Sequence, residues 1–454
     1  MTHYNLIVIG FGKAGKTLAK YASSQGQQVA LIEQFTESYG GTCINHGCIP
    51  SKVLVNDGIK HVDFSTAFSR KKEVVKALNQ KNYLNLENDE NITLLNFKAQ
   101  FKSNTEVELI DEKGKLVQTL TADKILINTG AKSNIPNIEG IDSAQNVYDS
   151  KGLLNISYQP KELVIIGGGY IALEFASMFQ SFGTNVTVLE YNKQFMARED
   201  HEIVKHIIND FKDKGVRLIT NVETKALKNE GNLTTVETSQ GNFTGDAILL
   251  ATGRVPNTDL ALDNTDIELG THGEIKVNNH LQTSVSHIYA AGDVKGGLQF
   301  TYISLDDFRI LKSELFGDRS RHTENRGTIP YTVFIDPPLS RVGMTALEAQ
   351  KLNYNYVENT LFINTLPKHK INNDGRGLFK VVINKDNNEI LGATLYGKGS
   401  EEIINLIKLA IDQHIPYQVL RDNIYTHPTI AESFNDLFNI CLLYTSPSPR
   451  DGLL

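Results

Sequence analysis

The same arrangement of apolar segment, glycine turn, helix and acidic residue occurs twice in this chain. The first copy runs from YNLIVIG through GFGKAG, and the second from LVIIGGG through YIALEFA. Gly10 to Glu33 and Gly167 to Glu190 have identical spacing. Each opening segment is continuously apolar rather than alternating, which is typical of a strand buried on both faces of a parallel sheet. The sequence therefore predicts an α/β fold with two Rossmann-like units.

The glycines and the acid of each unit have a known physical role in binding a dinucleotide. Glycines allow the backbone to approach a pyrophosphate at the helix N-terminus, and the acid accepts a hydrogen bond from a ribose hydroxyl. We therefore expect two nucleotide ligands, although one unit could instead be empty. The acids favour a nucleotide whose adenosine has a free 2′-hydroxyl. Lys193 lies close to Glu190 in sequence and weakens the case against a nucleotide with a 2′-phosphate. The turn residues are Gly10, Gly12 and Gly15 in the first unit and Gly167, Gly169 and Ala172 in the second.

Two of the three cysteines lie five residues apart in the stretch GGTCINHGCIPSK. In a straight helix this spacing separates two residues by about 7.5 Å of rise, which exceeds the usual disulfide Cα distance of about 4.4 to 6.8 Å. Cys43 and Cys48 can therefore bond only in a distorted turn. Gly41, Gly47 and Pro50 supply the backbone freedom and the missing amide donor for that distortion. We predict a reducible, redox-active disulfide.

Two other interpretations compete with this redox role. The cysteines could be structural, but a structural disulfide is disfavoured in a chain that looks cytosolic. They could also bind a metal together with His46, but a closed zinc site needs four ligands and the chain has no second cysteine pair. We therefore expect redox chemistry and no metal site.

The composition narrows the class of partner. The formal net charge is −7 over 454 residues, which disfavours nucleic acid and anionic membranes because both bind concentrated basic surfaces. No uninterrupted apolar run approaches the roughly 18 residues of a membrane span, and no signal peptide precedes the first strand. We expect a cytoplasmic protein of about three domains with a small diffusible substrate.

The rest of the chain predicts further elements around these features. Residues 54–90 are helical and charged, which indicates a solvent-exposed face with no chemistry. Residues 91–130 predict a β-meander that ends in KILINTGA, and ILLATGRVPN repeats this strand and turn. SHIYAAGDV places Asp293 after a strand, where a carboxylate suits a sugar-like hydroxyl, although an Asp after Gly is more often a turn residue. From about Gly327, alternating strands and an amphipathic helix predict an α+β domain without a nucleotide signal.

Together these segments resemble the class I pyridine nucleotide-disulfide oxidoreductases, the family of dihydrolipoamide dehydrogenase, glutathione reductase and mercuric reductase. The resemblance covers residues 1 to about 440 and rests on the two glycine turns, GTCINHGCIPSK, ATGRVPN, AAGDV and HPTIAE. Within the family, GGLQFTYISLDDFRI and PPLSRVGMT look most like the bacterial reactive-chlorine-resistance flavoproteins that reduce hypothiocyanous acid. The final segment, CLLYTSPSPRDGLL, does not continue the fold and resembles non-native, disordered sequence.

The resemblance implies two Rossmann-like dinucleotide-binding domains and a C-terminal α+β dimerisation domain. It also implies FAD and NAD(P)H as cofactors, with NADH favoured by Glu190. The expected boundaries are 1–148 and 274–326 for the two parts of the FAD-binding domain, 149–273 for the NAD(P)-binding domain, 327–440 for the dimerisation domain and 441–454 for the tail. The expected FAD-binding residues are Gly10, Gly12, Gly15, Glu33, Lys52, Gly130 and Asp293. The expected NAD(P)-binding residues are Gly167, Gly169, Ala172, Glu190 and Arg254.

The resemblance also implies distinct roles for the two cysteines. Cys48 would be the thiolate that faces the flavin, and Cys43 the outer thiol that meets the substrate. Lys52 would lie by the flavin with Glu174 as its ion partner. A thiolate beside a cation has a lowered pKa, so this arrangement is chemically sensible.

A histidine from the C-terminal domain completes the implied site. His427, paired with Glu432, would come from the other subunit of a homodimer and serve Cys43 as acid and base. A histidine oriented by a carboxylate suits proton transfer near neutral pH. From its own segment alone, His427 would more readily be interpreted as a helix-capping histidine on a solvated surface.

Differences from known relatives narrow the substrate. Mercuric reductases carry a vicinal cysteine pair near the C-terminus and large thioredoxin reductases an extra C-terminal redox pair, whereas Cys441 stands alone here. We therefore expect an NAD(P)H-dependent flavoenzyme that reduces a small oxidant, with hypothiocyanous acid as the leading substrate and a role in oxidative stress resistance. Dihydrolipoamide dehydrogenase, a glutathione-type disulfide reductase and a non-catalytic redox or nucleotide sensor remain alternatives.

Overall fold

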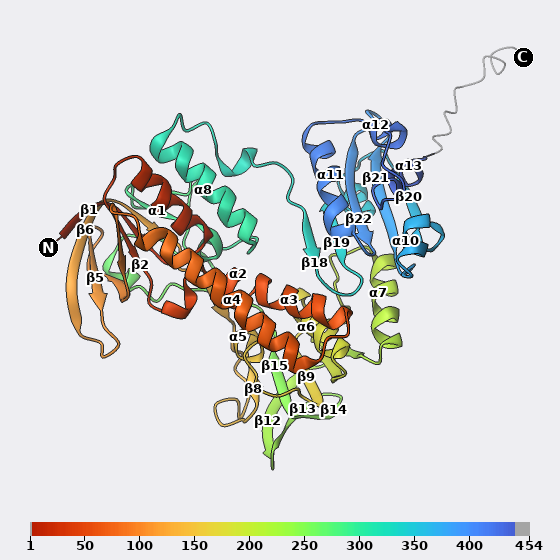
Figure 1. The fold of residues 1–454 in the computed structure, drawn as a ribbon, viewed down its shortest axis with the longest axis horizontal. Coiled ribbons are helices and arrows are strands. Elements are labelled where there is room, and N and C mark those ends of the chain that lie inside the picture. The colour runs from red at the N-terminus through yellow and green to blue at the C-terminus, as the bar shows by residue number, and fades with distance from the viewer. Residues whose placement is uncertain (1, 441–454) are drawn as a thin grey trace, which may run out of the picture. The chain divides into compact units, whose positions relative to one another are not determined.

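The computed structural model describes residues 2–440, so the tail predicted at 441–454 lies outside the described residues. The chain divides into two compact units, each built from two segments. The first unit runs to Lys193 and continues from Ile219 to Arg326, and the second comprises Gln194–Leu218 and the chain from Gly327 onward. Figure 1 labels the helices and strands in chain order.

A seven-stranded sheet lies in the first unit. β1 (Thr2–Ile9) pairs in parallel with β2 (Val29–Ile32) on one side and with β6 (Leu116–Ile127) on the other. The strands follow the order β3-β2-β1-β6-β5-β4, and β17 (Ile288–Ala290) adds in parallel to β6. The second half of β1 is buried, as its continuous apolar pattern predicted, and α1 (Lys13–Ser24) packs against β1 and β2.

The prediction of a β-meander over residues 91–130 was wrong for its first strand. β3 (Ile92–Leu95) pairs in parallel with β2, whereas β4 (Lys98–Phe101), β5 (Glu106–Ile110) and β6 are antiparallel neighbours. The reason is the long helix α4 (Phe64–Glu87) that precedes β3. Parallel strands need a crossover of a dozen or more residues, and α4 provides it.

The second glycine turn belongs to another parallel sheet of the first unit. β9 lies between β10 and β15 and is parallel to both, and α6 (Tyr170–Ser181) follows β9. The arrangement repeats that of β1, α1 and β2, as the equal spacing predicted. In spatial order the strands within this unit are β10 (Asn185–Leu189), β9 (Glu162–Ile166), β15 (Ala247–Leu250) and β8 (Val147–Tyr148). A separate antiparallel sheet contains β12 (Thr224–Glu230), β13 (Leu233–Thr238) and β14 (Gly241–Gly245).

The second unit is built on an antiparallel sheet with helices, which agrees with the predicted α+β pattern. α7 (His201–Asp213) belongs to this unit, because the Tyr396 hydroxyl donates to Asp210 Oδ2 at 2.5 Å. The helix α11 (Ser400–Asp412) packs on β19 and β22. In spatial order the strands are β18 (Tyr331–Val333), β19 (Leu339–Gly343), β22 (Ile390–Tyr396), β21 (Leu378–Asn384) and β20 (Tyr356–Phe362).

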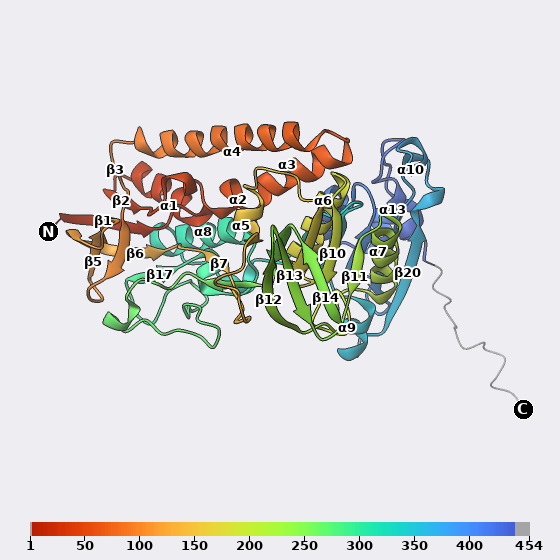
Figure 2. The ribbon, with the colours of Figure 1, turned by 90° about the horizontal axis from the view of Figure 1, so that it is seen from below.

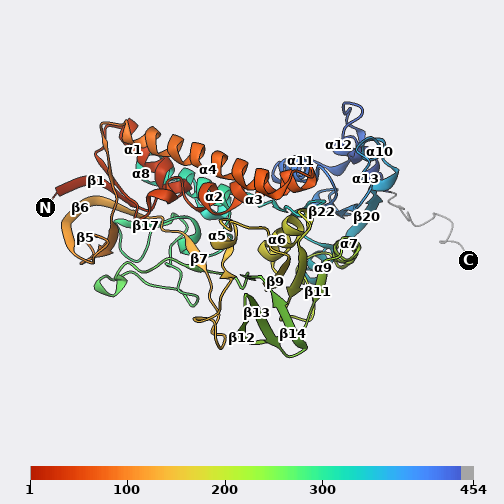
Figure 3. The ribbon, with the colours of Figure 1, turned by 60° about the horizontal axis from the view of Figure 1, so that its bottom comes forward.

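Two helices of the first unit position the cysteine pair. α3 (Cys48–Ile59) begins at a cysteine, and α4 runs alongside it, as Figures 2 and 3 show from two directions. Across residues 2–440, no helix is long and apolar enough to cross a membrane.

Candidate active site

The two cysteines sit on either side of a break between helices. α2 (Thr42–Asn45) ends before His46, and α3 begins at Cys48. A Cβ atom on Gly47 would lie 3.1 Å from the Thr42 carbonyl oxygen and 3.4 Å from Cys43 Cα, so a larger residue would crowd the backbone of the turn by a few tenths of an ångström. Both cysteines are free thiols, and their side chains hydrogen-bond to each other. The distorted turn that the spacing required is therefore present.

The cysteine pair loses its first proton easily. The pKa of Cys43 is lowered to about 6, chiefly because the Cys48 thiol donates a hydrogen bond to it. Burial opposes this shift, while Thr301, Lys16 and Lys52 reinforce it. The pKa of Cys48 is raised, chiefly because its thiol donates the hydrogen bond to Cys43, and burial and the negative charge on Cys43 raise it further. Near neutral pH the pair therefore holds one proton and one thiolate, which is the nucleophilic form.

Thr301 is a site residue that the sequence analysis missed. It is the first residue of α8 (Thr301–Phe316), and its Oγ1 lies 3.8 Å from Cys48 Sγ. Its neighbours Phe300 and Tyr302 stack with ring centroids 5.1 Å apart. More than 250 residues separate Thr301 from the cysteines in sequence (|i−j| = 253), so no local pattern could have indicated the contact.

Lys52 and Glu174 come together as the resemblance implied. Lys52 Nζ lies 2.5 Å from Glu174 Oε2, and the two side chains are 29% and 14% exposed. Lys52 extends from α3 and Glu174 from α6. This ion pair therefore joins the helix that begins at Cys48 to the helix that follows the second glycine turn. Its role beside the flavin stays a prediction, as does the division of roles between the two cysteines.

The long helix α4 packs against the cysteine loop, so the predicted solvent-exposed face was wrong for part of residues 54–90, whereas their having no part in the chemistry stays a prediction. Asn79 Nδ2 donates to Asn45 Oδ1 at 3.0 Å and to the Tyr39 carbonyl at 3.3 Å. Asn82 Oδ1 accepts a hydrogen bond from Lys16 at 2.6 Å. Asn79 and Asn82 lie on a charged helix that is mostly exposed. Only their contacts with the cysteine loop and Lys16 distinguish them from the solvated residues of that helix.

The two glycine turns have the same local geometry. Gly10 has φ +101°, and a Cβ there would lie 2.4 Å from the carbonyl oxygen of Asn128, just beyond β6. Gly167 has φ +108°, and its Cβ would lie 2.4 Å from the carbonyl oxygen of Ala251, just beyond β15. In each case the first glycine permits both the positive φ and the contact with the neighbouring strand.

The first turn fits an FAD molecule. Gly12 caps α1 without a side-chain hydrogen bond, and the positive dipole end of the helix suits a pyrophosphate. The amides of Ala14 and Gly15 already donate to Ser304 Oγ at 3.1 Å and to Asn128 Oδ1 at 2.9 Å. A Cβ on Gly41 would lie 3.0 Å from Gly12 Cα, which places the cysteine loop directly against this turn. The Glu33 carboxylate accepts from the backbone N–H groups of Phe11 and Phe35, each at 3.0 Å. Burial raises the pKa of Glu33.

Asn128 is a second residue that the sequence analysis missed. Its Oδ1 accepts from Gly15 N at 2.9 Å, and its Nδ2 donates to the Ala291 carbonyl at 2.6 Å. It thereby joins the glycine turn to the segment before Asp293, whose pKa is raised by burial. Gly130, two residues further on, has φ +73°. The side-chain amide of Asn128 thus links Gly15 to Ala291, two residues before Asp293, and both Gly15 and Asp293 are predicted FAD-binding residues.

The second turn ends at a fixed carboxylate. Glu190 is buried, and its Oε1 accepts from the backbone and side-chain nitrogens of Asn192 at 2.6 and 2.5 Å. Gly169 caps α6, and Ala172 is fully buried within that helix. Arg254 donates to the backbone carbonyl of Ala131. Its predicted contact with the nicotinamide nucleotide stays a prediction.

His427 and Glu432 form a pair in the second unit. His427 Nδ1 lies 2.8 Å from Glu432 Oε2, and the histidine side chain is 70% exposed. Because the carboxylate engages Nδ1, Nε2 is the ring nitrogen that can exchange a proton with a substrate.

Comparison with known proteins identifies the family. The pyridine nucleotide-disulphide oxidoreductase family matches residues 4–307, and the dimerisation domain of the same family matches residues 329–438. The chain belongs to the pyridine nucleotide-disulphide oxidoreductase family. It is 44% identical over 441 residues to the probable pyridine nucleotide-disulfide oxidoreductase RclA of Escherichia coli K12, covering 97% of this chain and all of the relative. It is 30% identical to a Staphylococcus aureus mercuric reductase, covering 94% of this chain and 81% of that protein.

Solved structures agree with this assignment. A Cu(II) complex of the HOCl-induced flavoprotein disulfide reductase RclA from Escherichia coli matches with a TM-score of 0.94 at 44% identity, covering 96% of this chain and 99% of that one. This oxidoreductase is therefore an enzyme with the family's α/β fold, its cofactors FAD and NAD(P)H, and a dimerisation domain. Its own residues 2–440 contain no group of three or more His, Cys, Asp or Glu side chains placed to hold a metal ion.

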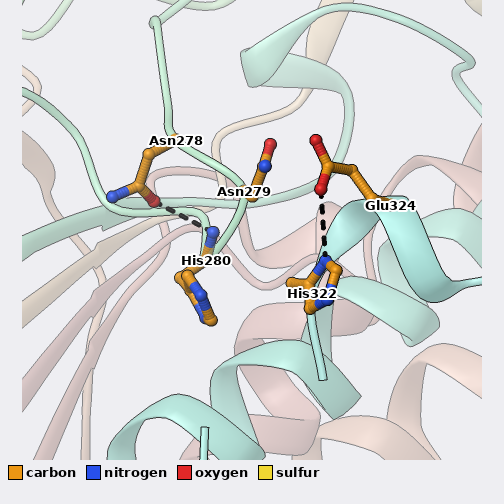
Figure 4. Close-up of a pocket in the computed structure, with 5 residues that line it drawn as sticks. All are labelled: Asn278, Asn279, His280, His322 and Glu324. Atoms are coloured by element: carbon orange, nitrogen blue, oxygen red, sulfur yellow. Dashed lines mark hydrogen bonds and ion pairs between the residues drawn. The ribbon is translucent and has the colours of Figure 1, made fainter. Parts of the chain in front are cut away.

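A pocket elsewhere in the oxidoreductase does not belong to this site. It has a volume of about 360 Å³ and is lined by Asn278, Asn279, His280, His322 and Glu324, as Figure 4 shows. None of these residues is a predicted site residue, and no cysteine lines the pocket. The reactive centre is therefore assigned from the thiol pair and its partners rather than from this cavity.

Proposed function

We propose that this oxidoreductase passes hydride from NADH through FAD to the Cys43–Cys48 pair, which then reduces the small electrophilic oxidant hypothiocyanous acid. The observation that carries this proposal is the Cys43 thiol, whose pKa of about 6 makes it a thiolate at neutral pH. A thiolate already formed can attack an electrophilic sulfur without a general base. The likeness to RclA, a protein described as HOCl-induced, supports a role in resistance to reactive oxidants.

The proposed reaction proceeds in balanced steps. The first glycine turn and Glu33 would hold FAD, which would supply, from the hydride of the nicotinamide nucleotide, the electron pair and the proton that convert the disulfide into the Cys43 thiolate and the Cys48 thiol. Cys43 Sγ attacks the sulfur of hypothiocyanous acid, and the S–O bond breaks as the leaving hydroxide takes the proton of the Cys48 thiol to become water. Cys48, once deprotonated, attacks Cys43 Sγ, releases thiocyanate and restores the disulfide. The sum is one NADH and one hypothiocyanous acid giving NAD⁺, thiocyanate and water.

A second candidate is dihydrolipoamide dehydrogenase, which the His427–Glu432 pair favours. A dithiol substrate must lose protons and a disulfide substrate must gain them, so either needs an acid or base beside Cys43. The 2.8 Å contact between His427 Nδ1 and Glu432 Oε2 suits that task. Hypothiocyanous acid demands less help, because its sulfur is already electrophilic. A glutathione-type reductase is a further alternative, whereas the family assignment excludes the non-catalytic redox or nucleotide sensor considered from the sequence.

The proposal includes several finer assignments. The enzyme would work as a homodimer in the cytoplasm, with His427 of the partner subunit serving Cys43 and with no nucleic-acid or membrane partner. NADH would be preferred over NADPH because of Glu190. The domain boundaries would be 1–148 with 274–326, 149–273 and 327–440.

One steady-state comparison tests the function. We would measure NADH oxidation and kcat/KM with hypothiocyanous acid, lipoamide and oxidised glutathione, and NAD⁺ reduction with dihydrolipoamide. We expect the highest kcat/KM with hypothiocyanous acid, its loss in Cys43→Ser and Cys48→Ser, and a smaller loss in His427→Ala. If another of these substrates gives a higher kcat/KM than hypothiocyanous acid, the proposal is wrong, and the activity of the relative that uses that substrate becomes the assigned function. If none of these substrates is turned over, both the proposal and the two alternative substrate classes are wrong.

A further inference from the structure

Lys16 is a half-buried cation whose hydrogen-bond acceptors are both neutral. Its Nζ donates to Asn82 Oδ1 at 2.6 Å and to the Gly40 carbonyl at 3.2 Å. Within residues 2–440, no carboxylate lies within 4.0 Å of this nitrogen. By contrast Lys20, one turn later on α1, is paired with Asp89 at 2.7 Å. A cation held in this way lacks a compensating charge.

The backbone that Lys16 contacts leads directly to Cys43. Gly40 has φ +95°, and a Cβ there would lie 2.8 Å from Ile44 Cδ1 and 3.2 Å from Asn82 Cγ. The turn is therefore packed tightly between α4 and the start of α2. Because the ammonium is bonded to this turn, three residues before Cys43, it has a fixed position relative to the thiol rather than a mobile one in solvent.

We propose that Lys16 is a positioning residue that supplies the counter-charge for the Cys43 thiolate formed when the disulfide is reduced. This inference rests on the proposed use of Cys43 as the attacking thiolate. In the oxidised enzyme the disulfide is neutral, and no carboxylate of residues 2–440 pairs with Lys16. Reduction places a negative charge on Cys43, and the two charges then stabilise each other. Lys16 thereby keeps the thiolate reactive without a base.

The other groups around the thiol do not duplicate this role. Lys52 also lowers the Cys43 pKa, but Glu174 already compensates its charge. Cys48 and Thr301 contribute neutral hydrogen bonds, and Lys13 repels Lys16. Burial, followed by Lys13, lowers the pKa of Lys16 to about 8, and the Cys43 charge opposes this. Both groups are therefore ionised between about pH 6 and pH 8, with Cys43 protonated below this window and Lys16 neutral above it.

The test measures the ionisation of Cys43 itself. In flavin-loaded Cys48→Ser enzyme, Cys43 is a lone thiol, and its alkylation by iodoacetamide is followed from pH 5 to pH 9.5 by mass spectrometry of its peptide. Lys16→Gln keeps a hydrogen-bond donor but removes the charge. We expect it to raise the apparent pKa of alkylation by about one unit and to slow alkylation at pH 6.5 by roughly three- to tenfold. Lys16→Arg should retain most of the wild-type profile.

The controls separate charge from structure. Lys20→Gln removes an exposed cation from the same helix and should leave the profile unchanged. Flavin content and melting temperature report folding, and Lys16→Met serves as a second neutral variant should Lys16→Gln lose flavin. An unshifted profile in a flavin-loaded neutral variant overturns the inference, as does an equal shift in Lys16→Arg. Alkylation uses no oxidant, so these outcomes are independent of whether hypothiocyanous acid is the substrate.

Discussion

The charge on Cys43 depends on side chains from four places in the sequence. Cys48 lies in the same stretch, Lys52 follows one turn later, and Lys16 and Thr301 come from α1 and α8. Each supplies either a hydrogen bond or a positive charge, and together they outweigh the effect of burial. A cysteine in the same short sequence without these partners would keep a pKa near 8.5 and remain mostly protonated at neutral pH.

The predicted roles of the two cysteines can be separated spectroscopically. The two cysteines share one proton after reduction. If Cys48 faces the flavin, anaerobic reduction with NADH gives a long-wavelength charge-transfer band when that proton lies on Cys43 and leaves the Cys48 thiolate beside the flavin. We expect Cys48→Ser to abolish this band and Cys43→Ser to retain it, as followed by absorbance during titration. Survival of the band in Cys48→Ser with its loss in Cys43→Ser would reverse the assignment.

Glu190 should determine the choice of nicotinamide nucleotide. Its carboxylate is held by Asn192 at the end of β10, where it can accept from a 2′-hydroxyl but repels a 2′-phosphate. We expect the wild type to show a higher kcat/KM with NADH than with NADPH, and Glu190→Ala to narrow that ratio by about tenfold, or about 1.4 kcal/mol. Lys193→Gln is the matched control for the neighbouring cation. A wild-type preference for NADPH would contradict the assignment.

At the scale of elements, α4 acts as a brace for the cysteine loop. It carries Asn79 and Asn82 on the face that meets the loop, while its neighbouring residue Gln80 is exposed. Loops with few packing contacts tend to open locally, and amide hydrogen bonds from a long helix limit such opening. We therefore expect α4, which carries no cofactor motif, to limit local opening of the turn that holds the cysteines.

Removing one brace residue should weaken the fold around the turn. Asn79 Nδ2 contacts the carbonyls of Thr36, Glu37 and Tyr39 as well as Asn45 Oδ1. We expect Asn79→Ala to lower the free energy of unfolding by about 1–2 kcal/mol, because the part-buried acceptors at Tyr39 and Asn45 lose their donor. The measurement is urea denaturation of the holoenzyme. Gln80→Ala should change stability by less than about 0.5 kcal/mol, and equal losses in the two variants would argue against a specific brace.

At the scale of the whole molecule, the chain combines two copies of one nucleotide-binding arrangement with a dimerisation domain. The thiol pair lies in the first unit and the His427–Glu432 pair in the second. Our proposal assigns the histidine to the site of the other subunit, so catalysis should require a dimer.

Subunit mixing tests this shared site. Cys43→Ser and His427→Ala chains are each defective, but a mixed dimer contains one site with an intact Cys43 and an intact His427. We expect mixing to restore up to half of the wild-type activity per dimer, measured with an acceptor whose reduction falls in His427→Ala. The double variant Cys43→Ser/His427→Ala, mixed with His427→Ala, is the control that should stay inactive. Mixed dimers that form but show no recovery would count against the shared site.

Local sequence patterns determined those features that depend on short stretches of backbone. The glycine turns were predictable because Gly10 and Gly167 must adopt positive φ and approach a neighbouring strand, which no other residue type allows as readily. The break between α2 and α3 was predictable because two cysteines five residues apart cannot otherwise meet. The Lys52–Glu174 pair followed from the family resemblance rather than from spacing.

Only the tertiary structure decided which distant residues complete the site. Asn128, Asn79, Asn82, Lys16 and Thr301 have ordinary local sequence contexts, and their partners lie tens to hundreds of residues away. The same applies to β3, whose parallel pairing depends on the crossover through α4 rather than on its own four residues. Periodicity and turn chemistry act over a few residues, whereas these contacts exist only because packing of the sheets and helices brings separate segments together.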